Sequence, residues 1–132
     1  MDDDLEGLAS AAIDCALRVH VDLGPGLLEI VYETVLAKRM ANLGLKVDRQ
    51  VPIKILVDGI TFPEGFRADM IVEDRLLIEI KATERLASVH TRQTLTYLRM
   101  MKLPLGLLMN FGGITFREGL KRIANNYGLS QK

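Results

Sequence analysis

The chain has 132 residues, of which 48% are hydrophobic and 26% charged, and its 17 basic and 17 acidic residues give a formal charge of zero at pH 7. This composition is typical of one soluble globular domain over residues 1–132 and excludes a disordered or fibrous chain. A nonspecific nucleic-acid binder usually has a large positive excess, so any nucleic-acid partner would have to meet a local basic patch.

The cysteine content and the N-terminus indicate the compartment. Cys15 is the only cysteine, which excludes an intramolecular disulfide and a cysteine-based zinc site and fits a reducing setting. Met1 is followed by three aspartates, the wrong charge for a signal or transit peptide, and no apolar run approaches the ~20 residues of a membrane-spanning helix. We therefore expect a cytoplasmic protein with no membrane partner.

The N-terminal third of the sequence predicts two helices. Apolar residues recur at helical spacing from Leu5 to about Val21, and the glycines and proline of residues 24–26 then form a corner. A second helix is predicted from Pro25 to Asn42, because proline suits the first turn of a helix.

The middle of the chain predicts an antiparallel meander. Residues 45–57 are rich in Val and Ile, Asp58-Gly59 is a hairpin signal, and a return strand over residues 60–72 is interrupted around residues 63–65. A third strand is predicted over residues 76–82.

The C-terminal third adds a helix, a strand and a helix. Ser88 is expected to cap a helix that runs to about Lys102, and residues 105–109 form a short apolar run typical of a buried strand. A last short helix is predicted from the spacing of Leu120, Ile123, Ala124 and Tyr127. The expected fold is α/β, with a central mixed sheet built on the antiparallel meander and flanked by helices.

Three charged side chains interrupt the apolar strands of the meander. Apolar and charged residues alternate over residues 78–81, so Glu79 and Lys81 share one face, and Asp69 enters from the preceding strand. Two carboxylates beside an amine could hold a divalent cation. A two-residue turn at residues 73–74 would put Asp69 on the other face, so we predict a three-residue turn or a bulge between Asp69 and Glu79.

Charged residues on one face of a strand are also common where that face of the sheet is exposed to solvent. In this alternative the three charges form only a surface salt-bridge array, which would present an open face with no pocket. The functional interpretation gains from three polar residues on the flanking helices, Glu29, Gln93 and Tyr97, which could close over one face of the sheet.

Residues 26–32 read Gly-Leu-Leu-Glu-Ile-Val-Tyr, and this Gly-x-x-Glu-x-x-Tyr pattern resembles the signature of the GxxExxY protein family, a branch of the PD-(D/E)XK nuclease superfamily. The resemblance implies a restriction-endonuclease-like core. Other similar positions occur in family order over roughly residues 10–125: Val19-His20, residues 23–26, Arg67-Ala68-Asp69, Glu79-Ile80-Lys81, Gln93, Tyr97 and Leu98.

Related exonucleases of the lambda-exonuclease and RecB type suggest roles for these residues. By resemblance, Asp69 and Glu79 bind Mg²⁺ or Mn²⁺ together with the carbonyl of Ile80. Lys81 orients or deprotonates the attacking water, or neutralises charge on the phosphate. Glu29 is the helix acid that reaches the metal directly or through water.

Several other candidate residues have alternative interpretations. Gln93 and Tyr97 resemble a Gln-x-x-x-Tyr motif that supports the site and touches substrate, or they merely pack, and Tyr32 is counted among the supporting residues. Arg67 would pair with Glu29 or Glu79, grip a phosphate, or form a structural ion pair. His20 would bind metal, or cap or pack between helices, and Glu33 is a weaker acid candidate.

The resulting hypothesis is a metal-dependent nuclease that hydrolyses phosphodiester bonds in nucleic acid, with DNA the expected partner. The alternative, favoured by neutral charge and small size, is a noncatalytic binding or assembly module that keeps the nuclease fold and uses its cleft or an edge strand for a protein partner or a second copy.

Overall fold

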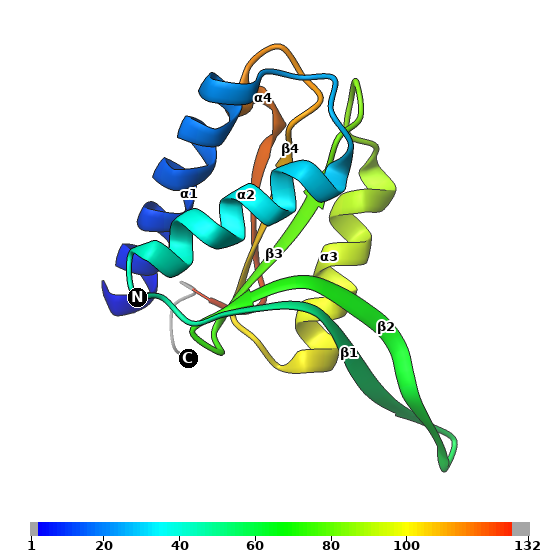
Figure 1. The fold of residues 1–132 in the computed structure, drawn as a ribbon. Helices are drawn as coiled ribbons and strands as arrows, with labels where there is room; N and C mark the ends of the chain where they lie inside the picture. The colour runs from blue at the N-terminus through cyan, green and yellow to red at the C-terminus, as the bar shows by residue number, and fades with distance from the viewer. Residues whose placement is uncertain (1–2, 128–132) are drawn as a thin grey trace.

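A five-stranded sheet runs through the middle of the protein, with helices on both of its faces (Figure 1). The structure is a computed structural model, and it describes residues 3–127. The elements in chain order are α1 (Asp3–Leu23), α2 (Glu29–Asn42), β1 (Val47–Val57), β2 (Ile60–Val72), β3 (Leu76–Lys81), α3 (Ser88–Met101), β4 (Leu105–Asn110), α4 (Phe116–Gly119) and β5 (Leu120–Ala124).

The strands are arranged in sequence order across the sheet, β1-β2-β3-β4-β5. Neighbouring strands are antiparallel except β3 and β4, which are parallel and are joined through α3. Such a crossover is needed because parallel neighbours cannot be joined by a tight turn. The predicted mixed sheet with an antiparallel meander is confirmed.

Each face of the sheet has its own apolar core. The larger core packs α1 and α2 against β3 and β4, and it includes Leu5, Val19, Leu36, Met70, Ile78 and Met109. The smaller core lies on the α3 side and includes Ala68, Leu77, Leu98, Leu108 and Ile123. All six residues of β4 are buried, which explains why that strand reads as a continuous apolar run.

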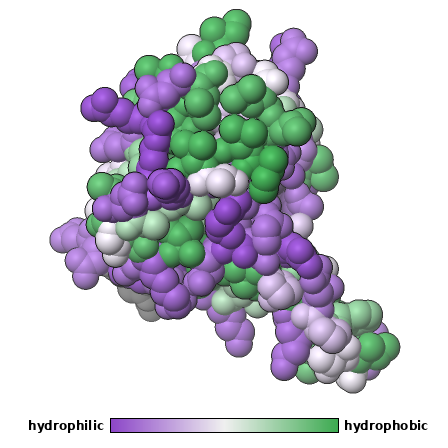
Figure 2. Space-filling model, in the orientation of Figure 1, coloured by the Kyte–Doolittle hydropathy of each residue, from purple (hydrophilic) through white to green (hydrophobic). Residues whose placement is uncertain are grey.

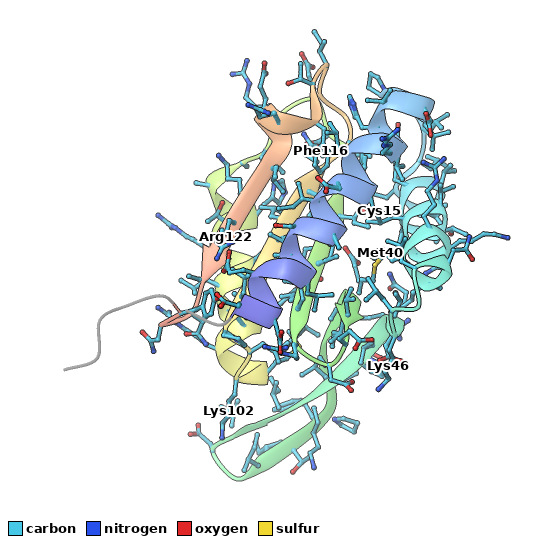
Figure 3. All side chains as sticks on the ribbon, turned by 90° about the vertical axis from the view of Figure 1, so that its left-hand side faces the viewer. Cys15, Met40, Lys46, Lys102, Phe116 and Arg122 are labelled. Atoms are coloured by element: carbon cyan, nitrogen blue, oxygen red, sulfur yellow. The ribbon has the colours of Figure 1, made fainter. Side chains whose placement is uncertain are left out.

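Side chains of α1 tie the first helix to the core and to the last strand (Figure 3). Cys15 packs half-buried against the larger core. Arg122 of β5 forms an ion pair with Glu6 of α1, and the Tyr127 hydroxyl donates to the same carboxylate over 2.7 Å. Within residues 3–127, the helices are too short or too polar to cross a membrane.

The turn between β2 and β3 has three residues, as predicted. Val72 pairs with Leu76 and Met70 with Ile78, so residues 73–75 form the loop. Glu73 and Asp74 adopt left-handed backbone conformations, with φ of 53° and 58°, and the Arg75 N–H donates to the Val72 carbonyl over 3.1 Å.

Two helix boundaries differ from prediction. The second helix begins at Glu29, not Pro25, because Gly26 has φ of 108° and Leu28 is extended, neither of which a right-handed helix allows. Ser88 does not cap α3. The cap residue is Ala87, whose N–H donates to Nδ1 of His90 over 3.1 Å, so the side chain at the third helical position binds back to the cap backbone and no serine side chain caps the helix.

The predicted C-terminal helix is wrong. After the four-residue α4, the chain forms β5, which pairs antiparallel with β4 from Leu105↔Ala124 to Met109↔Leu120. A buried β4 needs backbone partners on its outer edge, and this tertiary requirement outweighs the helical spacing of the apolar residues.

The return strand β2 is continuous, but an irregularity falls where an interruption was predicted. Ile55 pairs with Phe62 and Ile53 with Phe66, so residues 63–65 lie opposite Lys54 alone. The pairing register of β1 and β2 shifts at this bulge. The shift determines which β1 residues lie opposite which β2 residues on the side of the bulge away from the hairpin turn.

Gly112 lies tightly against the loop after β3, and this contact gives a stability prediction. Asn110 exchanges hydrogen bonds of 2.9 Å with the backbone of Thr83, and a Cβ on Gly112 would lie 2.1 Å from the Thr83 carbonyl oxygen. Gly112→Ala should therefore lower the free energy of unfolding by ~1–3 kcal/mol in urea denaturation. Gly113→Ala is the control, because its nearest atom is 3.6 Å away; equal effects of the two substitutions would contradict this contact.

Candidate functional site

Asp69 and Glu79 face each other where β2 and β3 part. The regular pairing of these strands ends at Met70↔Ile78, and the same register places Asp69 opposite Glu79. The Asp69 N–H donates to Oε2 of Glu79 over 2.8 Å, and the Ile80 N–H donates to Oδ2 of Asp69 over 2.8 Å. Side-chain oxygens thus bridge the two strands just beyond the last regular pair.

Burial and mutual repulsion make the Glu79 carboxylate costly to ionise. Glu79 is 5% exposed, and burial, together with the smaller effect of the Asp69 charge, raises its pKa to about 8, although the Asp69 N–H and Lys81 act in the opposite direction. A second carboxylate beside a buried one raises the pKa in this way when no cation fully offsets the pair.

Glu29 extends this acidic group from the first residue of α2. Burial raises its pKa, Lys81 lowers it, and Asp69 and Glu33 raise it. The Ala82 N–H donates to the Glu29 carboxylate, so this side chain faces the end of β3. The structure therefore brings Glu29 and Lys81 to the same end of the sheet as Asp69 and Glu79.

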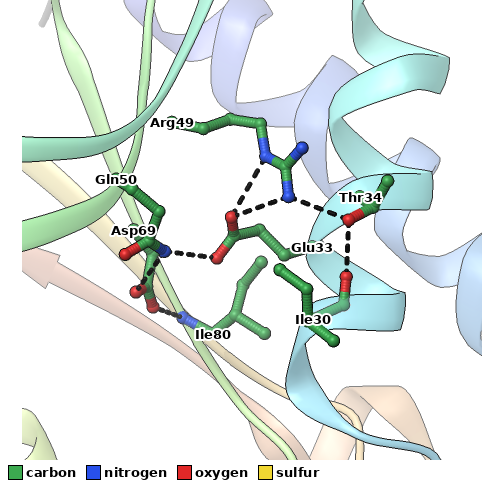
Figure 4. A network of polar contacts seen from close by, with 7 residues as sticks. All are labelled: Ile30, Glu33, Thr34, Arg49, Gln50, Asp69 and Ile80. Carbon is green, nitrogen blue, oxygen red and sulfur yellow. Dashed lines mark hydrogen bonds and ion pairs between the residues drawn. The ribbon is translucent and has the colours of Figure 1, made fainter.

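A polar network joins α2, β1 and β2 beside the acids (Figure 4). Glu33 is buried, accepts a hydrogen bond of 2.8 Å from Gln50 and forms an ion pair of 3.0 Å with Arg49. Gln50 Nε2 also lies 3.4 Å from Oδ1 of Asp69. Sequence reasoning missed Arg49 and Gln50. It predicted an interruption around residues 63–65, but not the register shift that this bulge causes and that sets the partners of Arg49 and Gln50 on β2.

Two residues of α3 lie on the face of the sheet opposite to α2, which is the face that the α3 core covers. The Tyr97 ring stacks on Phe66 with centroids 4.0 Å apart. Burial raises the pKa of Tyr97, as do the charges of Glu79 and Asp69, while a hydrogen bond with Gln93 lowers it. Gln93 itself is exposed, so its amide is accessible beside the Tyr97 hydroxyl.

Tyr32 is fully buried and holds the corner between α1 and α2. Its hydroxyl donates to the Gly24 carbonyl over 2.6 Å and accepts from the Leu27 N–H over 3.1 Å. Its ring stacks on Phe111 with centroids 4.8 Å apart. This residue supports the position of Glu29 one turn earlier and is not placed to touch a substrate.

Two other predicted residues have partners outside the acidic group. Nε2 of His20 lies 2.9 Å from the Gly113 carbonyl, and its ring lies among phenylalanine rings of the larger core. Arg67 forms a 2.7 Å ion pair with Glu64 of its own strand. In this structure His20 therefore packs between elements, and Arg67 forms a structural ion pair, as in the alternatives that the sequence left open for these two residues.

The side chains do not form a complete metal cage by themselves. Over residues 3–127, no cluster of three or more His, Cys, Asp or Glu side chains is arranged to hold a metal ion. A cation between Asp69 and Glu79 would complete its shell with main-chain oxygen and water, or with Glu29 after a side-chain movement.

Together these features define an α/β domain with an acidic pair, Glu79 buried and Asp69 half-buried, at the point where two central strands part. The family model of the PD-(D/E)XK nuclease superfamily matches residues 6–123, and the chain belongs to this superfamily. Comparisons with curated proteins and with solved structures gave no match.

The raised pKa of Glu79 gives a stability prediction. Because the folded-state pKa of about 8 exceeds the ordinary 4.5, the folded protein holds this proton more tightly, and its free energy of unfolding should fall as pH rises from about 5 to 9. Glu79→Gln cannot ionise, so in EDTA its stability relative to wild type should rise over this range by ~2 kcal/mol or more.

Urea denaturation at several pH values measures this difference. The exposed Glu84 supplies the control, since Glu84→Gln should have the wild-type pH profile. Parallel profiles for Glu79→Gln and wild type would show that Glu79 ionises without penalty in the fold.

Proposed function

We propose that the protein is a metal-dependent nuclease that hydrolyses phosphodiester bonds, with DNA as the expected substrate, and that it belongs to the GxxExxY branch of its superfamily. The observation that carries the proposal is the pair of bridged carboxylates, Asp69 and Glu79, with Lys81 beside them at the end of β3.

The donor atoms of this pair suit Mg²⁺ or Mn²⁺. Within residues 3–127, the hydrogen bonds that bridge the strands use Oε2 of Glu79 and Oδ2 of Asp69. The other carboxylate oxygens, with the Ile80 carbonyl and Glu29, offer the hard oxygen ligands that these ions prefer. A bound ion would polarise the scissile phosphate and lower the pKa of a coordinated water.

Lys81 and the α3 residues supply the other groups of the proposed site. The Lys81 charge acts on both Glu29 and Glu79, and in the proposed mechanism its ammonium would orient the attacking water or stabilise charge on the phosphate. Gln93 and Tyr97 would contact or position the substrate, and Arg67 would bind a neighbouring phosphate in place of Glu64.

The Gly-x-x-Glu-x-x-Tyr pattern has a physical explanation that supports the branch assignment. Gly26 adopts φ of 108°, a conformation that strongly favours glycine. Glu29 begins α2 and receives the Ala82 N–H, and Tyr32 bonds back to the Gly24 carbonyl. The three residues thus shape the corner that directs an acid toward the end of β3.

One observation favours the alternative of a noncatalytic binding or assembly module. The β1–β2 hairpin extends from the body of the protein (Figure 1), and apolar residues gather at its end beside polar ones (Figure 2). Leu56 is 68% exposed and Phe62 43% exposed. Apolar groups concentrated on a projecting arm are typical of a surface that meets another protein chain.

Cleavage assays separate the two functions. With Mg²⁺ or Mn²⁺, we expect wild type to cleave single- or double-stranded DNA or RNA, and Glu79→Gln, Asp69→Asn and Lys81→Met each to lower the rate by ~100-fold or more, because each removes a group that stabilises the transition state.

The exposed acid Glu84 provides a matched control, and Glu84→Gln should keep the wild-type rate. Absence of cleavage on all four substrates, or equal rates for wild type and Glu79→Gln, would reject the nuclease and favour the binding module.

A further inference from the structure

Gln50 has an unusual backbone conformation directly opposite Asp69. Its φ is 49°, in the left-handed region that non-glycine residues rarely occupy. The flanking pairs Arg49↔Met70 and Val51↔Ala68 place Gln50 across from Asp69 on the neighbouring strand. Such a conformation persists only where surrounding contacts hold it, and the Gln50 side chain has contacts with two neighbouring carboxylates.

The Gln50 amide lies between two carboxylates. Its Nε2 donates to Oε1 of Glu33 over 2.8 Å and lies 3.4 Å from Oδ1 of Asp69 (Figure 4). Because ionised carboxylates only accept hydrogen bonds, the NH₂ group, and not the amide oxygen, must face both acids. The Ile80 N–H binds the other oxygen, Oδ2, of Asp69, so contacts at both oxygens restrict rotation of this carboxylate.

Glu33 is a suitable anchor for the amide. It is 4% exposed, and Arg49 contacts its Oε2 through Nε at 3.1 Å and Nη2 at 3.0 Å. Arg49 also donates to Thr34 over 2.8 Å. The buried acid is therefore paired with a cation on the side away from Gln50, which leaves Oε1 to hold the amide.

We propose that Gln50 is a positioning residue that orients the Asp69 carboxylate for a divalent cation, with Glu33 and Arg49 as its anchor. The inference rests on the metal site of the proposed function. A neutral amide is suited to this role, because it orients Asp69 without cancelling the negative charge that attracts the cation, whereas a direct arginine contact would compete with it.

Two variants test the role of the amide. Gln50→Met removes the donor at similar size, and Gln50→Gly removes the side chain while suiting the left-handed backbone, so at least the second should fold. Calorimetric titration with Mn²⁺ should show about tenfold weaker binding in both variants than in wild type. Lys54→Met, an exposed change on the same strand, should leave the affinity unchanged.

A metal-free readout accompanies the titration. Amide hydrogen exchange measured by NMR in EDTA should show loss of protection at Ile80, whose N–H binds Asp69 Oδ2. Protection at the Asp69 N–H, which binds Glu79, should change less. A purely structural role for Gln50 would instead loosen both amides together.

The outcomes separate this inference from the proposed function. Wild-type Mn²⁺ affinity in a folded Gln50→Gly variant would overturn the positioning role and leave the metal site intact. If wild type itself bound no Mn²⁺, the metal-dependent function would fail, and with it the role of Gln50 in cation binding, whatever the Ile80 amide showed.

Discussion

The site depends on an exchange of hydrogen bonds between Asp69 of β2 and the neighbouring residues Glu79 and Ile80 of β3, at the point where the two strands part. Each carboxylate accepts a backbone N–H from the opposite strand at 2.8 Å. The exchange requires the two residues to face each other, which in turn requires the three-residue turn between β2 and β3. Beyond the last regular pair, these side-chain oxygens join the two strands in place of backbone hydrogen bonds, so the acids that we propose as metal ligands also have a structural role.

Placing several acids close together is electrostatically unfavourable, and residues on the surrounding elements compensate part of this repulsion. Burial and Asp69 raise the pKa of Glu79 to about 8, whereas Lys81 acts in the opposite direction. Glu33, a further buried acid, is compensated by Arg49 and Gln50. A divalent cation would relieve the remaining repulsion, which is the physical reason that the proposed function is tied to a metal.

Local alternation of residues was enough to predict the acidic pair, whereas the contacts that depend on long-range register could not be predicted. The hypothesis that Asp69 and Glu79 share a face required a three-residue turn or a bulge between them, and the three-residue turn is found; only ten residues separate the two acids, so few register choices exist. Gln50 could not be found in this way: the register at Val57↔Ile60 would place it opposite Arg67, and only the bulge at residues 63–65 moves it to Asp69. The last helix was predicted wrongly for a related reason, since β5 forms to pair with β4.

The most direct test of the proposed metal site is a crystal structure of the protein grown or soaked with Mn²⁺, with anomalous scattering used to locate the ion. We expect an anomalous peak between the carboxylates of Asp69 and Glu79 and none there in Asp69→Ala crystals. A wild-type structure with saturating Mn²⁺ and no peak between these carboxylates would contradict the proposed site.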